Sequence, residues 1–275
     1  MRFEDADFLD QQYGTSEGLA VRIETHRRYG TASKDIFEEL TEKARDELEP
    51  LRILDVGAGD GNWYRTLRRV LGSEPFYVGL DRSDGMVEHL REAQAGDARA
   101  QVVRGDAQAL PWTLPEFDWV GMHFMLYHAP DIPRAIAEAW RILRPGGLLL
   151  AATVSTSSYR ELAELQLEGL RAMGYSAARI AQPSDRFSLE TGAQYFPVRS
   201  EILDCPGGLR FDAAEPALRY LASGPIDAAI AQAGAPASLR RDLLAYVGQR
   251  IDAEIRRAGS FTVRSKSGCF VVTKR

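Results

Sequence analysis

The run Leu54-Asp-Val-Gly-Ala-Gly-Asp-Gly61 constrains the fold of this chain more than any other feature. Residues 51–56 form a short apolar run that ends on glycine, as buried parallel strands do. Gly57, Gly59 and Gly61 let the backbone approach a ligand closely, and the helix expected next presents its N-terminus to that ligand. The segment from Gly57 to Gly61, here called the glycine turn, therefore predicts the start of an open α/β sheet.

Alternating strands and helices continue beyond this turn. The expected strands after the first are residues 76–80, 101–103, 117–124 and 148–154. Between these strands, apolar residues recur at helical spacing and predict helices, and Asp131 is the expected cap of the last of these helices. Repeated strand–helix units imply a parallel sheet that is covered on both faces.

The second half of the chain is expected to be mostly helical. The expected elements are helices at residues 159–173, 212–222 and 239–255 and a sixth strand at 198–203. Phe261-Thr-Val-Arg and Cys269-Phe-Val-Val-Thr flank Ser-Lys-Ser-Gly, so they are expected to form a hairpin whose last strand closes the sheet. Before the sheet, helices are expected at residues 19–29 and 33–48.

The charge of the chain bears on its partners. The 275 residues carry a net charge of −5, and arginine pairs are scattered among acids. A protein that holds nucleic acid through its phosphates needs a basic face, so nucleic acid is not an expected partner. The acidic first segment has no apolar core and is no signal peptide, and no apolar run is long enough to span a membrane. We therefore expect a cytoplasmic protein without membrane contact.

The two cysteines, Cys205 and Cys269, lie far apart in the sequence and form no Cys-x-x-Cys motif. Such a pair fits two reduced thiols in a cytosolic chain, and a single disulfide is the alternative. No cluster of His and Cys has the spacing of a zinc site, so no metal is expected.

Asp55 decides which ligand suits the glycine turn. The spacing is Gly-x-Gly-x-Gly, whereas the dinucleotide fingerprint is Gly-x-Gly-x-x-Gly, which disfavours a nicotinamide-dependent oxidoreductase. A carboxylate at the strand end repels a pyrophosphate but binds the α-ammonium group of an amino acid. Asp55, with the backbone of Gly57, Ala58 and Gly59, is therefore expected to hold the methionyl end of S-adenosylmethionine.

Residues after the second and third strands complete the expected cofactor site. Asp81 ends the second strand, where a carboxylate either accepts both ribose hydroxyls or caps the next helix. Arg82 follows it, and Met86 either packs on adenine or belongs to the core. Asp106 follows the third strand and is expected to accept a hydrogen bond from the adenine amino group, while Ala107 offers its backbone N–H to the ring.

Five motifs in register resemble those of class I, Rossmann-like S-adenosylmethionine-dependent methyltransferases. They are LDVGAGDG, VGLDRSDGMV, RGDAQALPW, FDWVGMHFMLYHAPD and RILRPGGLLLAAT, all within residues 51–155. Their sequences are similar to those of the branch that contains ubiquinone and menaquinone methyltransferases and many small-molecule enzymes. The resemblance implies a seven-stranded, mostly parallel sheet with an antiparallel last strand, and cofactor contacts at Asp55, Gly57, Asp81 and Asp106.

The end of the fourth strand is the expected floor of the active site. Amino-methylating DNA and RNA enzymes often have Asn/Asp-Pro-Pro-Tyr/Phe there, but this chain has Gly121-Met-His-Phe-Met125. This departure disfavours a nucleobase amine as the methyl acceptor. His123 and His128 are the candidate catalytic residues. The resemblance also places His123 at the methionyl part of the cofactor, and His128 is either a catalytic base or a cap of the loop before Pro130.

The chain outside residues 51–155 is where this family varies and chooses its substrate. Residues 1–50 are expected to form a helical lid, and residues 51–275 a methyltransferase domain with a helical insertion at about 205–260. Both variable segments are expected to pack over the carboxyl edge of the sheet, where ligands of open α/β sheets bind. The candidate lid contacts are Tyr13, His26 and Arg28.

These features predict an enzyme that transfers a methyl group to a small molecule by in-line displacement. The expected cofactor is S-adenosylmethionine and the product S-adenosylhomocysteine, with alignment in a water-poor pocket as the main source of catalysis. The alternatives are an RNA or protein methyltransferase and a non-catalytic S-adenosylmethionine-binding regulator, since intact acids predict binding without proving turnover. The chain is expected to be a monomer or a homodimer.

Overall fold

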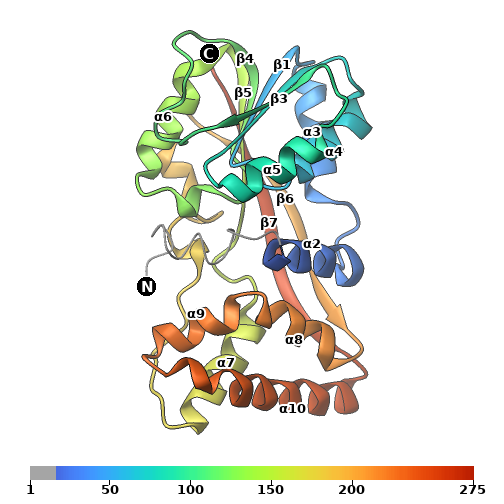
Figure 1. The fold of residues 1–275 in the computed structure, drawn as a ribbon, viewed down its shortest axis with the longest axis vertical. Coiled ribbons are helices and arrows are strands. Elements are labelled where there is room, and N and C mark those ends of the chain that lie inside the picture. Colours follow the sequence, from blue (N-terminus) through green and yellow to red (C-terminus); the bar gives the residue numbers. More distant parts are fainter. Residues whose placement is uncertain (1–16) are drawn as a thin grey trace.

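The computed structural model describes residues 17–275, which fold around a seven-stranded sheet (Figure 1). The strand order is β3-β2-β1-β4-β5-β7-β6. The strands are β1 (Arg52–Val56), β2 (Phe76–Asp81), β3 (Ala100–Arg104), β4 (Phe117–Gly121), β5 (Leu143–Val154), β6 (Glu201–Phe211) and β7 (Phe261–Thr273). Of these strands, only β7 runs against the others. The predicted Rossmann-like sheet with an antiparallel last strand is confirmed.

Helices cover both faces of the sheet. The helices next to it are α3 (Ile36–Glu47), α4 (Asn62–Leu71), α5 (Asp84–Ala93) and α6 (Ile132–Ile142). On one face, Leu40 of α3 and Trp63 of α4 pack with Trp119 of β4. On the other face, Ile136 of α6 packs with Val120 of β4. Successive residues of β4 thus enter two separate cores, as expected for a strand between two helical layers.

A second set of helices, here called the helical group, surrounds the far end of the β6–β7 ribbon, at the bottom of Figure 1. Its members are α7 (Arg160–Ala172), α8 (Ala214–Ala222), α9 (Pro225–Gln232) and α10 (Arg240–Ala258). β5 pairs with β7 only up to Val154, whereas β6 and β7 stay paired up to Phe211 opposite Phe261. The projecting part of the ribbon packs Leu209 and Val263 into a core that it shares with the helical group.

Two expectations for the second half of the chain are wrong. The Ser-Lys-Ser-Gly sequence at residues 265–268 does not turn, because it lies within one continuous strand whose residues 261–271 pair with β6. The hairpin partner of β7 is therefore β6, and α8, α9 and α10 lie between the two strands. The sixth strand occupies residues 201–211 rather than 198–203, and apolar spacing did not predict α9.

Polar side chains cap three helices. Asp131 accepts the backbone N–H of Arg134 at 3.0 Å, which confirms it as the cap of α6. Ser83 caps α5 in the same way, and Asp35 caps α3. These contacts satisfy N–H groups that a helix leaves unpaired at its start. The 3-10 helices are η1 (Leu126–His128), η2 (Pro183–Asp185), η3 (Gly192–Tyr195) and η4 (Ala237–Leu239).

Helix α2 (Glu17–Tyr29) lies between the sheet and the helical group (Figure 1). After its end, Gly30 forms a β-bridge with Leu209 of the ribbon. Near its start, Leu19 lies against the glycine turn, because its Cδ2 atom is 3.7 Å from the position that a Cβ on Gly59 would take. The helix therefore contacts both parts of the molecule.

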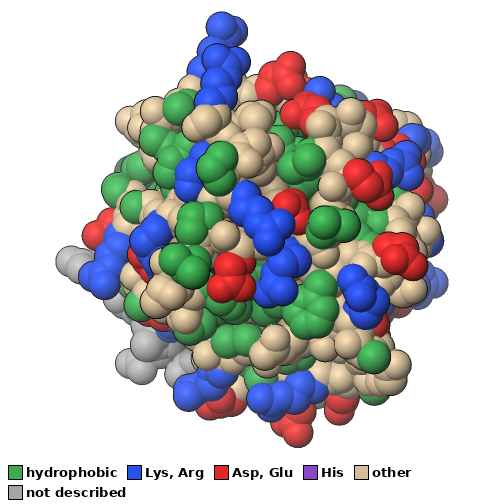
Figure 2. All heavy atoms as spheres, turned by 90° about the horizontal axis from the view of Figure 1, so that it is seen from above, with side chains coloured by type: hydrophobic (Ala, Val, Ile, Leu, Met, Phe, Trp, Pro, Cys, Tyr) green, Lys and Arg blue, Asp and Glu red, His purple; other side chains and the backbone are tan. Residues whose placement is uncertain are grey.

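The face at the amino ends of the parallel strands carries mixed charge. Figure 2 looks onto this face, and Lys and Arg side chains lie there among Asp, Glu and hydrophobic ones. At this edge Arg52 pairs with Glu116, and Arg144 pairs with Asp118. This face therefore offers a polyanion no extended basic surface among its described residues. Within residues 17–275, no helix is both long and apolar enough to cross a membrane.

Candidate functional site

The glycine turn joins β1 to α4 at the carboxyl edge of the sheet. Gly57, Gly59 and Gly61 have φ angles of 71°, 56° and 83°, in the left-handed region that favours glycine. The backbone N–H groups of Gly57 and Ala58 both donate to the carbonyl of Leu80, at 2.7 and 3.0 Å. The end of β2 therefore holds the turn in place.

The loop after β4 lies directly against this turn. A Cβ on Gly57 would come 2.8 Å from the Cβ of Met125, a contact that real Cβ atoms essentially never make. Phe124, just before it, has a φ of 53° and is, with Tyr159, one of two non-glycine residues with positive φ in the described chain. Such strained backbone clusters at functional sites. Sequence reasoning missed Phe124 and Met125, since nothing in their residue types marks the loop geometry.

Asp81 ties the glycine turn to the start of α5. Its two carboxylate oxygens accept the backbone N–H groups of Gly59 and Ser83, each at 2.9 Å. Burial raises the pKa of Asp81, and backbone hydrogen bonds from Ser83, Gly59 and Arg82 act in the opposite direction. The Arg82 side chain itself is exposed. Asp81 thus lies beside the turn at the end of β2, and its binding of ribose hydroxyls stays a prediction.

Asp55 lies in β1 with only 2% of its surface exposed. Its Oδ2 atom accepts a hydrogen bond from the Tyr77 hydroxyl at 2.8 Å, a partner that sequence reasoning missed. Burial raises the pKa of Asp55 to about 7; the Tyr77 hydrogen bond opposes this shift, and the charges of Asp81 and Asp60 add to it. Binding of an α-ammonium group by Asp55 stays a prediction.

The charges around the glycine turn fit a cationic ligand. The carboxyl groups of Asp60 and Asp81 lie near enough to Asp55 to disfavour its ionisation, although Asp60 also pairs with Arg65 at 2.7 Å. A positive group placed here relieves this repulsion, whereas a pyrophosphate adds to it. S-adenosylmethionine is positively charged at its sulfur and at its amino group, so it fits this edge better than a dinucleotide does.

The residues expected at adenine follow β3 and lie in α5. Asp106 is exposed, and its carboxylate accepts the backbone N–H of Gln108 at 2.8 Å. Ala107 and Met86 are 8% and 2% exposed. The burial of Met86 agrees with its alternative role as a core residue, and the adenine contacts of these residues stay predictions. Among the described residues, no group of His, Cys, Asp and Glu is arranged to hold a metal ion.

His123 is enclosed by aromatic side chains. Its ring packs edge-on against Trp63, with ring centres 4.3 Å apart, and lies 5.6 Å from Phe37 of α3. Neither ring nitrogen has a hydrogen-bond partner among the described residues, and burial lowers the pKa of His123 to about 3. The imidazole is therefore neutral at physiological pH and too weakly basic to take up a proton there. Its predicted contact with the methionyl group stays open, but a role as general base is disfavoured.

His128 lies in η1, in the same loop after β4. Its backbone N–H donates to the carbonyl of Met125 at 2.8 Å, and its ring lies edge-on to Tyr127 with centres 4.6 Å apart. Arg186 holds this loop from outside, since its guanidinium donates to the carbonyls of Tyr127 and Ala129 at 2.7 and 3.0 Å. Sequence reasoning missed Arg186, which lies 58 residues further along the chain than His128. The two predicted roles of His128 both stay open.

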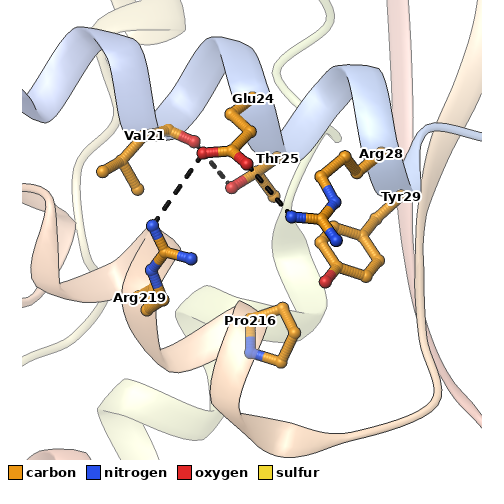
Figure 3. A pocket seen from close by; sticks show the side chains of 7 residues that line it. All are labelled: Val21, Glu24, Thr25, Arg28, Tyr29, Pro216 and Arg219. Atoms are coloured by element: carbon orange, nitrogen blue, oxygen red, sulfur yellow. Dashed lines mark hydrogen bonds and ion pairs between the residues drawn. The ribbon is translucent and has the colours of Figure 1, made fainter.

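The two described lid candidates of α2 lie in different surroundings. Arg28 pairs with Glu24 at 3.1 Å and lines a small hollow between α2 and α8, where Arg219 also approaches Glu24 at 3.9 Å (Figure 3). His26 instead lies 3.3 Å from the Tyr159 hydroxyl, measured from its Nε2 atom. The third candidate, Tyr13, lies outside the described residues. The hollow is thus a feature of the contact between the two helices.

The family match lies mainly in the first half of the sheet. Residues 53–147 match the family described as a methyltransferase domain. A demethylmenaquinone methyltransferase from Staphylococcus aureus is 35% identical over 105 residues, which are 38% of this chain and 44% of that relative. The enzyme of the same name from Staphylococcus epidermidis is 36% identical over 104 residues, 38% and 43% of the two chains. This chain thus spans less than half the length of these relatives.

Solved structures extend the likeness to almost the whole fold. The YcgJ protein from Bacillus subtilis has a TM-score of 0.55 at 19% identity, covering 87% of this chain and 98% of that one. The [4+2]-cyclase SpnF has a TM-score of 0.52 at 17% identity, covering 98% and 96%. At such identities the likeness concerns the fold alone, and one of these folds is named for a cyclisation rather than a methyl transfer.

Proposed function

We propose that residues 53–147, which match a methyltransferase domain, form a class I S-adenosylmethionine-dependent methyltransferase domain, and that the protein transfers the cofactor's methyl group to a small-molecule acceptor. The observation that carries the proposal is the set of carboxyl groups around the glycine turn. Asp55, Asp60 and Asp81 favour a cationic ligand at the carboxyl edge, where open α/β sheets bind their ligands.

The side chains and backbone of this edge would hold the cofactor. Asp81 would receive the ribose hydroxyls, Asp55 the ammonium group and Asp106 the adenine amino group, with Gly57 and Gly59 allowing close approach. S-adenosylmethionine supplies a methyl group that is activated by the positive charge on its sulfur. The protein aligns the acceptor and keeps water out, which are the contributions that such a displacement needs most.

Three observations favour a small molecule as the acceptor. The net charge of −5 attracts a polyanion poorly, and the described part of the amino-end face mixes both charge signs. In Figure 1 the helical group and α2 lie opposite the carboxyl edge of the sheet, where we expect them to enclose a small-molecule pocket. The two staphylococcal relatives are named for a quinone substrate, which is a small molecule.

The cofactor assignment is tested by calorimetry. We expect S-adenosylhomocysteine to bind and NAD not to bind. Asp81→Ala should weaken binding by about 1–3 kcal/mol, because a charged hydrogen-bond partner is lost. Asp212→Ala removes an exposed carboxylate before α8 and serves as the matched control. Equal affinity of the Asp81 and Asp212 variants would remove the ribose assignment.

The acceptor class is tested by incubating the enzyme with methyl-labelled cofactor and separate pools of cell metabolites, RNA and protein. We expect label in the metabolite pool. Label in the RNA or protein pool alone would contradict the proposal. Tight binding of S-adenosylhomocysteine without label in any pool would identify a non-catalytic binding protein instead.

A further inference from the structure

Three polar aromatic residues from separate parts of the chain meet between α2 and the helical group. They are His26 of α2, Tyr159 just before α7, and Tyr220 of α8. The His26 ring lies edge-on to both tyrosine rings, with centres 6.0 and 6.1 Å apart, and the tyrosine rings stack at 6.1 Å. A polar contact joins the Nε2 atom of His26 to the Tyr159 hydroxyl at 3.3 Å.

Tyr159 is held in this position by strained backbone. Its φ and ψ angles are 60° and 21°, a left-handed conformation that bulky residues rarely adopt. Its backbone N–H donates to the carbonyl of Arg264 in β7 at 2.9 Å, and the preceding Ser158 hydroxyl donates to the carbonyl of Lys266 at 3.1 Å. Strain of this kind persists where the surroundings fix it and is common at functional sites. Here it directs the tyrosine ring toward α2.

The cluster lies within the length of a small molecule from the glycine turn. Leu19, which lies against Gly59, and His26 are seven residues apart in α2. Seven residues are close to two helical turns, so the two side chains share one face of the helix, about 10 Å apart along its axis. The same face of α2 therefore contacts the expected cofactor turn and the aromatic cluster.

The other three histidines are less suited to take a proton from an acceptor. His89 Nδ1 contacts the carbonyl of Gly85 at 2.7 Å within α5. His123 is buried among apolar rings, and its pKa of about 3 makes it a poor base. His128 lies in the loop that Arg186 holds. His26 is exposed, so solvent and an acceptor can reach its ring.

We propose that His26 is the general base of the methyl transfer and that Tyr159 is its positioning residue. This inference rests on the proposed function. In this role the Nε2–H of His26 donates to the Tyr159 oxygen, and Nδ1, for which the described residues 17–275 show no partner, accepts the proton. As the acceptor's oxygen, nitrogen or sulfur bonds to the methyl carbon, the carbon–sulfur bond of the donor breaks and its electron pair stays on sulfur. The proton of the acceptor passes to Nδ1 and then to solvent.

The charges around His26 allow this role. Tyr159, just before α7, and Tyr220 of α8 face the His26 ring. Glu24 lies on the same helix as His26 and pairs with both Arg28 and Arg219. Desolvation by the surrounding protein lowers the pKa of His26 below its usual value, although the residue as a whole is exposed. A lowered pKa keeps the ring neutral at physiological pH, as a proton acceptor must be.

The kinetic test compares His26→Gln and Tyr159→Phe with the wild type on the metabolite fraction that the wild type labels. Tyr246→Phe in α10 is the matched control. A general base contributes on the order of 10²–10⁴-fold, so we expect His26→Gln to lose at least about a hundredfold in kcat/KM at pH 7. The loss should shrink as the pH rises, because the acceptor then ionises by itself. Affinity for S-adenosylhomocysteine should stay within about twofold. Tyr159→Phe should shift the pH profile and lose less.

A second measurement does not depend on turnover. Nuclear magnetic resonance of labelled histidine should show His26 with one tautomer in the wild type and a mixture in Tyr159→Phe. If the wild type labels its acceptor, three results would overturn the inference. The first is an unchanged kcat/KM in His26→Gln, and the second is an equal fall of cofactor affinity and turnover in that variant. The third is an unchanged His26 tautomer in Tyr159→Phe. No labelling by the wild type would remove the proposed function, and the role of His26 with it.

Discussion

The buried carboxyl of Asp55 makes stability depend on pH. Its pKa is 3.8 in the unfolded chain and about 7 in the folded protein, mainly because burial disfavours the charged form. Between these values the unfolded chain has lost the proton that the folded protein keeps, so stability falls as the pH rises. Above about pH 7 Asp55 is ionised in both the folded and the unfolded state, so its destabilising effect no longer changes with pH. The difference between the two pKa values corresponds to about 4 kcal/mol as an upper figure.

Asp55→Asn should therefore become progressively more stable than the wild type between about pH 4 and pH 7. An amide carries no charge, and its oxygen can still accept from Tyr77. Urea unfolding of both proteins at several pH values measures this difference, and the other carboxyl groups cancel because both proteins contain them. A difference in stability that does not change with pH would show that Asp55 titrates normally.

Gly57 is constrained by both its backbone and its neighbour. Its φ is 71°, and an added Cβ would collide with Met125. Gly96 has a φ of 83° with nothing within 4 Å of an added Cβ, so Gly96→Ala isolates the backbone cost of about 1–2 kcal/mol. Gly57→Ala should lose more stability and should also weaken binding of S-adenosylhomocysteine. Urea unfolding and calorimetry provide the two measurements; equal losses in both variants would argue against close packing at the turn.

At the scale of secondary-structure elements, local signals predicted the first half of the chain well and the second half less well. Strands ending on glycine or aspartate and helices with polar caps carry their signals in adjacent residues, as at Asp131 and Asp81. The continuous strand β7 does not, because Ser265 to Gly268 resemble a turn until β6 pairs with them. Long-range pairing overrides local propensity there.

Helix α2 is the element whose position we expect to respond to ligand. Leu19 contacts the glycine turn, so bound S-adenosylhomocysteine should slow hydrogen exchange of the α2 amides. The amides of α10, which packs within the helical group, serve as the internal control. Equal protection of α2 with and without ligand would contradict its role as a lid.

At the scale of the whole molecule, the cofactor residues predicted from the sequence all lie in the part that the family match covers. Asp55 and the glycine turn carry their signal in one short motif, and Asp81 carries its signal in the next motif along the chain; both motifs lie within residues 53–147. The contact between His26 and Tyr159 joins residues 133 positions apart, and it exists only because the ribbon brings the helical group under α2. No local pattern encodes such a contact.

The pairing of Phe211 with Phe261 has a consequence for how proteins of this shape diversify. The chain leaves the sheet ribbon at Phe211 and returns to it directly opposite, so residues 212–260 begin and end at one point in space. We expect the replacement of this segment by another to leave the strand register, and with it the cofactor edge, in place. Selectivity for new acceptors can then arise by exchange of this segment, without a single change at the glycine turn.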